Sequence, residues 1–415
     1  MFPRWLAALI FFSLLGLLVG SQAFWFWQAR QLVRRQRRAW QRWLLGVPLY
    51  SGFAALAALF LLVPLRWFLV GNTPVLLTLF QQVRRPAVMV PLGLWLTASM
   101  FSFLLIVLVR APGLLARAVG RLRAPAGPQP ERRHFLETVT YAAGALPFVM
   151  VGYGFLIGRQ NYRVQEVAVP IPNLPEAFEG MRIVQLTDVH ASAYMPVREI
   201  SRVVGLAREV EADLVVHTGD FLSTRGDPLE AAVAELARVQ GRYGRFGCLG
   251  NHEIYAGASE AATEFFARRG VRILRHENVE FDVDGAKLNL IGVDYQRQPR
   301  RGGIEEWKKH FLRGVERLVR PEAVNILLSH NPNPFVRAAE LGIELTVAGH
   351  THGGQVQVEI LDTLWSPARF LTPFISGLYE RGDSRLYVSR GIGTIGAPVR
   401  INAPPEITQL TLRRA

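Results

Sequence analysis

The most informative stretch of the chain is Leu345-Thr346-Val347-Ala348-Gly349-His350-Thr351-His352-Gly353-Gly354. Its first four residues are typical of a buried strand, and the next six form a glycine-rich turn with two histidines. Side chains alternate between the faces of an extended segment. His350 and His352 therefore serve one site only if the backbone bends or something lies between them. Glycine permits such a bend and a close approach of the backbone. The stretch predicts a strand followed directly by a functional turn.

Short apolar strands alternate with amphipathic helices from Met181 onward, which predicts an α/β domain. One further strand is expected just ahead of this region. The expected strands are residues 163–169, 182–186, 214–217, 246–249, 288–293, 325–328, 345–348, 386–388 and 407–412. The expected helices are residues 197–210, 228–240, 259–269, 304–318 and 334–341.

Polar residues follow five of these strands at the point where each strand ends. In open α/β sheets, ligands bind beyond the carboxyl ends of the strands, so we expect these side chains to converge on one place. They are Asp188, His190, Asp220, Asn251, His252, Glu253, His330, His350 and His352.

The mixture of oxygen donors and imidazoles suits divalent first-row metals such as manganese, iron or zinc. Too many candidate ligands are present for one ion. They suit two ions bridged by a carboxylate, which together clamp the attacking and leaving oxygens of a phosphoryl displacement. Taken singly, Asp220 could instead cap a helix, and Asn251 could be an ordinary turn residue. The candidate ligands are Asp188, His190, Asp220, Asn251, His330, His350 and His352.

The ordered set resembles the five motifs of the calcineurin-like metallophosphoesterases, with about 30 residues, one strand-helix unit, between the first three. The resemblance covers residues 163–413 and implies a four-layer α/β/β/α sandwich. The tail 386–393 and the ending 405–408 resemble the membrane-associated or exported, twin-arginine-type subgroup. The motifs are Asp188-x-His190, Gly219-Asp220, Gly250-Asn251-His252-Glu253, His330 and Gly349-His350-x-His352.

The resemblance also implies a role for each residue of the set. Asp188, His190 and His352 would hold one metal, while Asn251, His330 and His350 would hold the other. Asp220 would bridge the two ions, which would activate a bridging hydroxide for attack on phosphorus. His252 is the expected proton donor to the leaving group, with Glu253 orienting it or a ligand. The catalytic residues are accordingly His252, Asp220 and Asn251.

Other residues of the same kinds stand outside this pattern. We expect His217 to be a core residue or to support a ligand. His134, His276 and His310 are expected to be solvated. Arg390 follows the last interior strand, where it could contact a substrate phosphate or form a structural ion pair.

The formal net charge of +14 lies entirely in residues 1–137, which hold 16 Arg, no Lys and two acids, among long apolar runs. This distribution is typical of membrane topology and speaks against a nucleic-acid-binding face. Cys248 is the only cysteine, so an internal disulfide is excluded. Nucleic acid is therefore not an expected partner.

Four uncharged runs are each at least as long as the ~20 residues that cross a bilayer, and we expect a multi-span membrane region at residues 1–158. A linker with the first strand would follow at 159–180, and the catalytic domain at 181–415. Residues 67–83 are expected to form an interfacial loop. The expected spans are residues 5–27, 44–65, 87–109 and 138–158.

The arginine-rich loops set the expected orientation. Six Arg follow the first span and six lie in the connector before the fourth, which places both loops in the cytoplasm. The catalytic domain would then lie on the extracytoplasmic side of the cell membrane. If the fourth run were a buried helix, that domain would be cytoplasmic. Arg132-Arg133 with Phe135-Leu136 resembles a twin-arginine export signal, although an ordinary positive-inside cluster looks similar.

These observations predict a membrane-anchored binuclear phosphoesterase that hydrolyses phosphomonoesters or phosphodiesters. A lipid-linked phosphate or a nucleotide-sugar lipid would explain the anchor. One alternative is a membrane sensor or scaffold with a structural metal site, which would not need His252. A transporter is disfavoured because the spans contain almost no ionisable residues.

Overall fold

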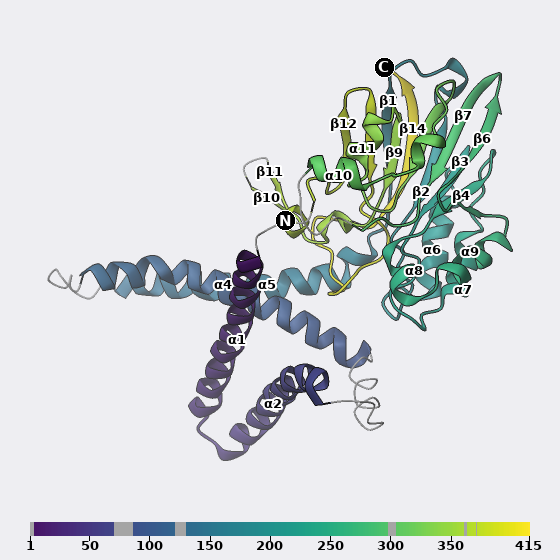
Figure 1. Ribbon diagram of the computed structural model, residues 1–415. Coiled ribbons are helices and arrows are strands. Elements are labelled where there is room, and N and C mark those ends of the chain that lie inside the picture. The colour runs from purple at the N-terminus through teal and green to yellow at the C-terminus, as the bar shows by residue number, and fades with distance from the viewer. Residues whose placement is uncertain (1–3, 70–85, 121–129, 298–303, 361–362, 371) are drawn as a thin grey trace. The chain divides into compact units, whose positions relative to one another are not determined.

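The computed structural model describes residues 4–69, 86–120, 130–297, 304–360, 363–370 and 372–415 (Figure 1). Its contacts divide the chain into two compact units, with the division between Gly152 and Tyr153. One unit is helical and the other contains both large sheets. The division falls near the end of a helix, so the last turn of that helix belongs to the second unit.

Long helices make up the first unit, as the long uncharged runs predict. Two of them contain segments long and apolar enough to cross a membrane, Val90–Gly113 and His134–Gln160, and these overlap the third and fourth expected spans. The described helices are α1 (Arg4–Arg35), α2 (Ala39–Leu69), α4 (Pro86–Gly120) and α5 (Pro130–Leu156).

The first two expected spans fall within α1 and α2. Both segments are helical, but the described residues give only the later two helices as candidates for crossing, so four crossings stay a prediction. The expected interfacial loop is helical up to Leu69, and its remainder lies outside the described residues.

Polar side chains link the helices of the first unit. Gln22 of α1 donates from Nε2 to Ser99 Oγ of α4 at 3.0 Å and accepts from Trp95 Nε1 at 2.9 Å. Ser102 Oγ of α4 donates to the carbonyl of Gly144 in α5 at 2.6 Å. Such bonds satisfy polar groups that an apolar environment leaves without water.

The second unit begins with a six-stranded mixed sheet in the order β1-β14-β2-β3-β4-β5. Strands β2 to β5 are parallel, β14 is antiparallel to β2, and β1 is parallel to β14. The strands are β1 (Arg163–Ile171), β14 (Glu406–Arg414), β2 (Arg182–Leu186), β3 (Leu214–Thr218), β4 (Arg245–Cys248) and β5 (Arg272–Ile273).

The second six-stranded sheet has the order β12-β13-β9-β8-β7-β6. Its four central strands are parallel, and both edge strands are antiparallel to their neighbours. The strands are β12 (Gly377–Arg381), β13 (Ser384–Val388), β9 (Leu345–Ala348), β8 (Val324–Leu328), β7 (Ala286–Gly292) and β6 (Glu277–Val283), and a separate hairpin pairs β10 (Val358–Ile360) with β11 (Thr363–Trp365).

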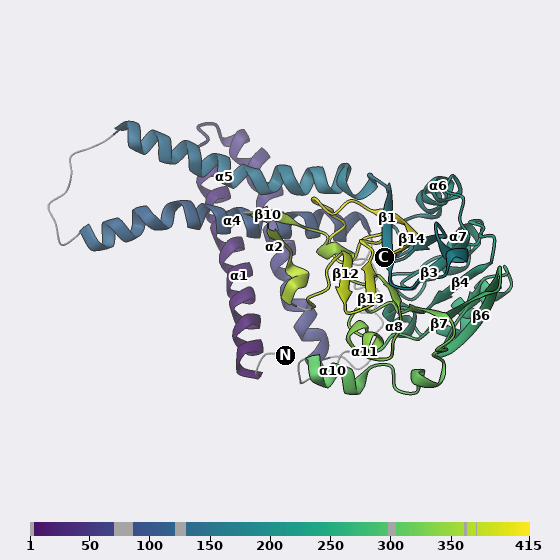
Figure 2. The same cartoon turned by 90° about the horizontal axis from the view of Figure 1, so that it is seen from above.

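The two sheets pack face to face, and helices cover their outer faces (Figures 1 and 2). The core between the sheets joins Val216 and Leu410 of the first sheet to Ile326 and Val347 of the second. The helices on the first sheet are α6 (Val197–Arg208), α7 (Leu229–Leu236) and α9 (Ser259–Ala267), and those on the second are α10 (Ile304–His310) and α11 (Phe335–Glu340).

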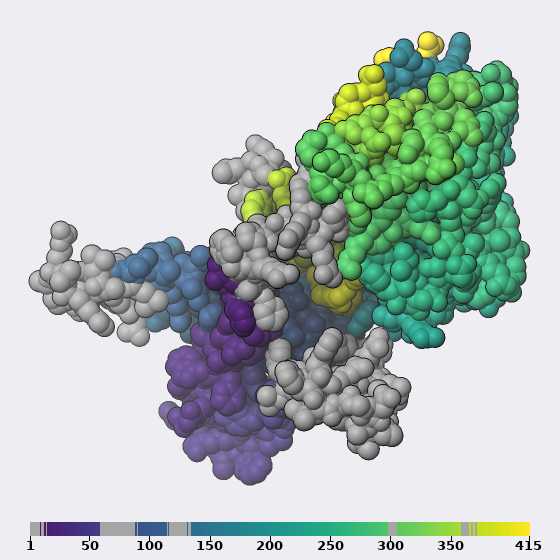
Figure 3. Space-filling view, viewed as in Figure 1, coloured from purple at the N-terminus to yellow at the C-terminus, as the bar shows by residue number. Residues whose placement is uncertain are grey.

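The order of layers is therefore helices, sheet, sheet and helices. In the space-filling view, residues of the second sheet and its helices form the green part of the surface (Figure 3). Parallel strands of both sheets end near one another, since ligand atoms of Asp220 after β3, His330 after β8 and His350 after β9 lie within 4.8 Å of one another.

Each of the nine expected strands is present, with ends displaced by at most a few residues. One expected helix is wrong: residues 304–318 form α10, a turn, and the short η3 (Val315–Arg317). The break has a backbone cause, because Leu312 and Gly314 have φ of 57° and 82°, which a helix cannot accommodate. The helix expected at 228–240 likewise ends at Leu236.

Candidate metal centre

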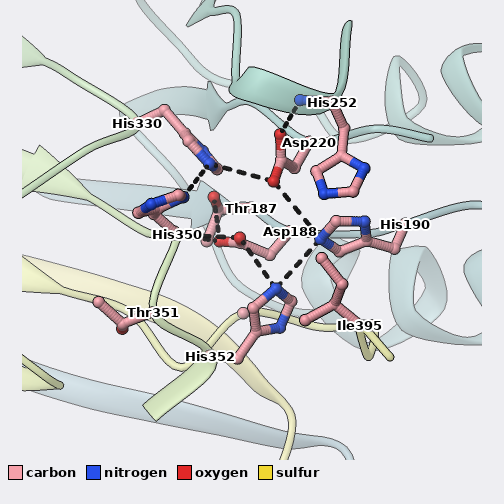
Figure 4. A network of polar contacts seen from close by, with 12 residues as sticks. Thr187, Asp188, His190, Asp220, His252, His330, His350, Thr351, His352 and Ile395 are labelled. Carbon is pink, nitrogen blue, oxygen red and sulfur yellow. Dashed lines mark hydrogen bonds and ion pairs between the residues drawn. The ribbon is translucent and has the colours of Figure 1, made fainter. Parts of the chain in front are cut away.

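The polar residues at the ends of five strands meet at one edge of the two packed sheets (Figure 4). From the first sheet, Asp188 and His190 follow β2, Asp220 follows β3, and α8 (Asn251–Ala256) begins three residues beyond the end of β4. From the second sheet, His330 follows β8 and the two histidines of the 349–354 turn follow β9. All the expected site residues are therefore in the same region.

Asp188, His190 and His352 form the first group of potential ligands, and all three are almost completely buried. His190 Nε2 lies 3.1 Å from His352 Nε2, which in turn lies 3.4 Å from Asp188 Oδ1. Three ligand atoms therefore point at a common position.

Asp220, His330 and His350 form the second group. His330 Nε2 lies 3.1 Å from His350 Nδ1 and 3.1 Å from Asp220 Oδ2. The same Asp220 oxygen lies 3.5 Å from His190 Nε2 of the first group. One carboxylate oxygen thus faces both groups, as a bridging ligand must.

These spacings fit a metal better than they fit hydrogen bonds. Two ligand atoms at about 2.1 Å from one ion, at angles of about 90–109°, lie about 3.0–3.4 Å apart. The two imidazole pairs, each at 3.1 Å, fall in this range. Asn251 Oδ1 is also buried and has no hydrogen-bond partner among the described residues. A buried acceptor without a donor is costly, and a cation would satisfy it.

Five of the seven candidate ligands have positive φ, between 48° and 74°, although none is glycine. Such conformations cost about 1–3 kcal/mol each and persist where the surroundings impose them, most often at functional sites. Strain at so many residues of one cluster indicates that the fold holds these side chains for a purpose other than stability. The five are Asp188, His190, Asp220, His350 and His352.

Glycine is required where two of the turns pass close to a carboxylate. A Cβ added to Gly349 would lie 2.1 Å from Asp188 Oδ2, and one added to Gly250 would lie 2.2 Å from Asp220 Oδ1. The glycines of these motifs therefore provide space for the carboxylates, in addition to their backbone freedom.

Hydrogen bonds outside the cluster orient its side chains. His330 Nδ1 lies 2.7 Å from the carbonyl of Thr218, which only accepts, so Nδ1 carries the proton and Nε2 is left for a ligand. The main-chain N–H of His350 donates to both oxygens of Asp188 at 3.0 Å, and Thr187 Oγ1 donates to Oδ2 at 2.8 Å.

Glu253 supports the loop that carries Asp220. Its Oε2 accepts from the main-chain N–H groups of Asp220 at 3.0 Å and Gly250 at 2.8 Å, and its Oε1 accepts from that of Phe221 at 2.7 Å. Glu253 therefore binds the backbone of Asp220, of the next residue Phe221, and of Gly250, which precedes Asn251.

His252 lies at the open side of the cluster and is only partly buried. Its main-chain N–H donates to Asp220 Oδ1 at 2.8 Å, and its Nδ1 lies 2.6 Å from the carbonyl of Ser223. Because a carbonyl only accepts, Nδ1 carries a proton and Nε2 remains available. The ring meets that of His190 edge-on, with centroids 4.6 Å apart.

Burial and neighbouring carboxylates set the charges of the cluster. Burial lowers the pKa of both His190 and His350 to about 3. Burial acts in the same direction on His330, but Asp220 and Asp188 outweigh it and raise the pKa of His330 to about 10. Burial raises the pKa of Asp220, yet His330 and other histidines hold it well below its ordinary value. An anionic carboxylate among mainly neutral imidazoles is the environment that a divalent cation requires.

The remaining histidines lie outside the cluster, as expected. His217 is buried against Phe221 and Phe266, with ring centroids at 6.4 and 5.3 Å. His134, His276 and His310 are exposed. Of the two interpretations of Arg390, the ion pair is present, since its Nε lies 2.8 Å from Glu406 Oε2.

Two features of the site escaped the sequence reasoning. The rings of Tyr295 and Tyr255 adjoin the cluster, with Tyr295 at 5.5 Å from the His350 ring and Tyr255 at 6.2 Å from that of His252. Arg400, whose Nη2 lies 3.4 Å from His352 Nδ1, is fully buried. Arginines and tyrosines are too common for either to stand out without the fold.

Known proteins are similar to this chain over the region that holds the cluster. The family model for calcineurin-like phosphoesterases matches residues 181–354. An uncharacterized metallophosphoesterase of Aquifex aeolicus is 30% identical over 272 residues, which cover 64% of this chain and 98% of that protein. The chain belongs to the calcineurin-like phosphoesterase family. The buried His/Asp cluster of this metallophosphoesterase lies within the matched residues and is consistent with a metal-dependent phosphoesterase.

Two further relatives bear on the helical unit of this metallophosphoesterase. The uncharacterized metallophosphoesterase YkuE of Bacillus subtilis is 27% identical over 289 residues, covering 68% of this chain and 97% of that protein. A transmembrane protein with metallophosphoesterase domain from Danio rerio is 29% identical over 335 residues, covering 78% of this chain and 72% of that protein. The latter match is longer than the sheet-containing unit and so extends into the helical one.

Proposed function

We propose that this metallophosphoesterase is a membrane-anchored binuclear hydrolase of phosphomonoesters or phosphodiesters. The observation that carries the proposal is the position of Asp220 Oδ2, 3.5 Å from His190 Nε2 and 3.1 Å from His330 Nε2. An oxygen between two imidazole groups suits a carboxylate that bridges two ions. The domain organisation that we propose is 1–158 for the membrane region, 159–180 for the linker with β1, and 181–415 for the catalytic domain.

The proposed ligands of one ion are Asp188, His190 and His352, and those of the other are Asn251, His330 and His350. Manganese, iron and zinc all suit this mixture of imidazole and oxygen ligands. Asp220 is the proposed bridge. When bound, the ions would neutralise the phosphate group and make a water molecule more acidic.

His252 is the proposed proton donor to the leaving group. Its Nδ1 proton is held by the Ser223 carbonyl at 2.6 Å, so the second proton of the charged ring resides on Nε2. That nitrogen can deliver the proton as the bond between phosphorus and the leaving oxygen breaks. A metal site with a structural role alone does not need such a group.

The proposed location is the cell membrane, with the catalytic domain on the extracytoplasmic side. Support comes from the two apolar helical segments, from the arginine-rich loops, and from the transmembrane relative whose similarity extends into the helical unit. We further propose that Arg132-Arg133 engages twin-arginine export machinery, which would let the domain fold before it crosses. A lipid-linked phosphate ester is the substrate class that best accounts for the anchor.

The proposal is tested with full-length protein in detergent. Aryl phosphomonoester and phosphodiester substrates are supplied with Mn²⁺ to the parent protein, to Asp220→Asn, and to the exposed control His276→Gln. We expect activity that a chelator abolishes, that the control retains, and that Asp220→Asn lowers by about 100-fold or more. A folded, Mn²⁺-loaded parent protein without activity on either substrate would favour the sensor or scaffold alternative.

A further inference from the structure

The last turn of α5 docks directly on the segment that precedes β14. Gly154 accepts a hydrogen bond at its carbonyl from the main-chain N–H of Arg400 at 3.2 Å. A Cβ on Gly154 would lie 2.6 Å from Val399 Cγ1, and one on Gly158 would lie 2.0 Å from the carbonyl oxygen of Arg400. Gly154 lies in the last turn of α5, and Gly158 begins the short 3-10 turn η1 (Gly158–Gln160) that follows it. Only residues without side chains allow this approach of the two backbones.

The side chain of Arg400 extends from this contact into the interior and is 1% exposed. Its Nε donates to the carbonyl of Gly393 at 3.0 Å, its Nη1 to that of Ala403 at 3.0 Å, and its Nη2 to that of Gly391 at 3.0 Å. No carboxylate lies within 4.0 Å of the guanidinium among the described residues. Burying an unpaired charge is costly, so a purely structural purpose would be better served by a neutral side chain.

The loop that Arg400 holds supports Asp188. The main-chain N–H of Gly393 donates to the carbonyl of Asp188 at 2.7 Å, and that of Ile392 donates to the carbonyl of Thr187 at 3.1 Å. A Cβ on Gly391 would lie 2.5 Å from Asp188 Cβ. The same guanidinium approaches His352 Nδ1 at 3.4 Å. Arg400 therefore contacts both a candidate ligand and the loop beneath another one.

We propose that Arg400 is a positioning residue that ties the end of α5 to the metal site formed by Asp188, His190 and His352. The backbone of Arg400 is held by the carbonyl of Gly154 and packs against Gly158, while its side chain donates to the carbonyls of the 391–393 loop that supports Asp188. The membrane-side helix end is accordingly part of the scaffold of this site. The His330 and His350 site has no such connection among the described contacts. The inference rests on the proposed binuclear centre.

The test uses full-length protein and measures bound Mn²⁺ per chain, Mn²⁺ affinity, and the melting temperature of the metal-free protein. We expect Arg400→Leu to weaken the binding of one ion by about 10–100-fold while the other ion stays bound. Arg400→Lys, which keeps one donor group, should recover part of that loss. The matched control is Arg385→Leu, because Arg385 is a buried arginine that also donates to carbonyls but lies on β13, outside the cluster.

A second pair of variants tests the connection to the helix. Gly158→Ala must displace the backbone of Arg400 and should weaken the same ion. Gly152→Ala lies on the same helix, where an added Cβ meets nothing within 4 Å, and should leave Mn²⁺ binding unchanged. If Arg400→Leu fails to fold, Gly154→Ala and Arg400→Lys test the same connection with smaller changes.

The outcomes separate the inference from the proposed function. If the parent binds two ions and Arg400→Leu binds both with unchanged affinity, the inference is wrong and the binuclear hydrolase stands. A fall in melting temperature alone, shared with Arg385→Leu, likewise overturns it. If the parent protein itself binds no Mn²⁺, the proposed function fails first.

Discussion

The carboxylate of Glu253 accepts the main-chain N–H of Asp220 at 3.0 Å, so an acidic residue of one strand-end turn fixes the proposed bridging ligand of another. In Glu253→Gln, an amide NH2 group replaces one of the two acceptor oxygens. Because NH2 is a donor, it cannot accept the main-chain N–H that it then faces. We expect metal affinity or activity to fall about 10–100-fold. Bound metal and kcat should be measured beside Glu264→Gln, which removes only an exposed ion pair with Arg268. An unchanged metal affinity and kcat would show that the backbone holds Asp220 without Glu253.

His252→Gln separates proton donation from metal binding. Loss of the proposed donor should lower kcat by about 100–10,000-fold, while the ions stay bound through the other residues. Substrates with a highly acidic leaving group need little protonation and should lose much less. Equal losses for good and poor leaving groups would argue against His252 as the donor.

Gly349→Ala tests whether the turn after β9 requires a residue without a side chain at position 349. The added Cβ would lie 2.1 Å from Asp188 Oδ2, so the carboxylate or the turn must move. We expect loss of the ion held by Asp188. The control Gly205→Ala lies in α6 with nothing within 4 Å, and should raise stability by up to about 1 kcal/mol, as alanine favours helices. Retained binding in Gly349→Ala would mean that the turn relaxes freely.

His217 should make the catalytic unit sensitive to acid. Burial, and then the nearby Arg245, lower its pKa to about 3, against about 6.5 in the unfolded chain. Between these values only the unfolded state binds the proton, so the free energy of unfolding falls by up to about 1.4 kcal/mol per pH unit as the pH decreases. Above about pH 6.5 both states are neutral and the effect vanishes.

His217→Leu removes the titrating imidazole and places an apolar side chain in the core. We expect the melting temperature of the metal-free variant to fall less than that of the parent between about pH 7 and pH 5. The control His276→Leu changes an exposed histidine and should show the same pH dependence as the parent. Identical pH dependence in the parent and His217→Leu would show that folding leaves the pKa of His217 unshifted.

The membrane orientation can be tested with single cysteines. Cys248 is buried, so Cys248→Ser gives a background without thiols. Asp284→Cys, in the exposed turn after β6, should react with an impermeant maleimide on intact cells. Ala124→Cys, in the arginine-rich connector, should react only after the membrane is opened. The reverse pattern would place the catalytic domain in the cytoplasm.

The strand-end residues could be predicted from sequence because each lies just beyond a short apolar run. Such a run can be identified as a strand without knowing which strands pair with it. His350 after β9 and Asp188 after β2 are of this kind. Edge strands were missed where they lack that signal: β6 and β12 have mainly half-buried or exposed residues, so their pattern is polar. The break after α10 depends on Leu312 with positive φ, a conformation that leucine seldom adopts.

Arg400 illustrates a different limit. Its neighbours are Gly154, far away along the chain, and carbonyls of a loop that has no regular structure. No local pattern marks a residue whose partners are main-chain atoms brought together only by the finished fold. The orienting role of Glu253 was expected, but its action on the backbone of Asp220 also required the folded structure.

The most direct test of the binuclear account is the number of metal ions per folded chain in full-length protein and in Asp220→Asn, measured by elemental analysis after loading with Mn²⁺. The account predicts two ions per parent chain, and in Asp220→Asn the loss of at least one ion together with hydrolytic activity. A parent chain that holds a single ion, or an Asp220→Asn variant that keeps two ions and full activity, would contradict it.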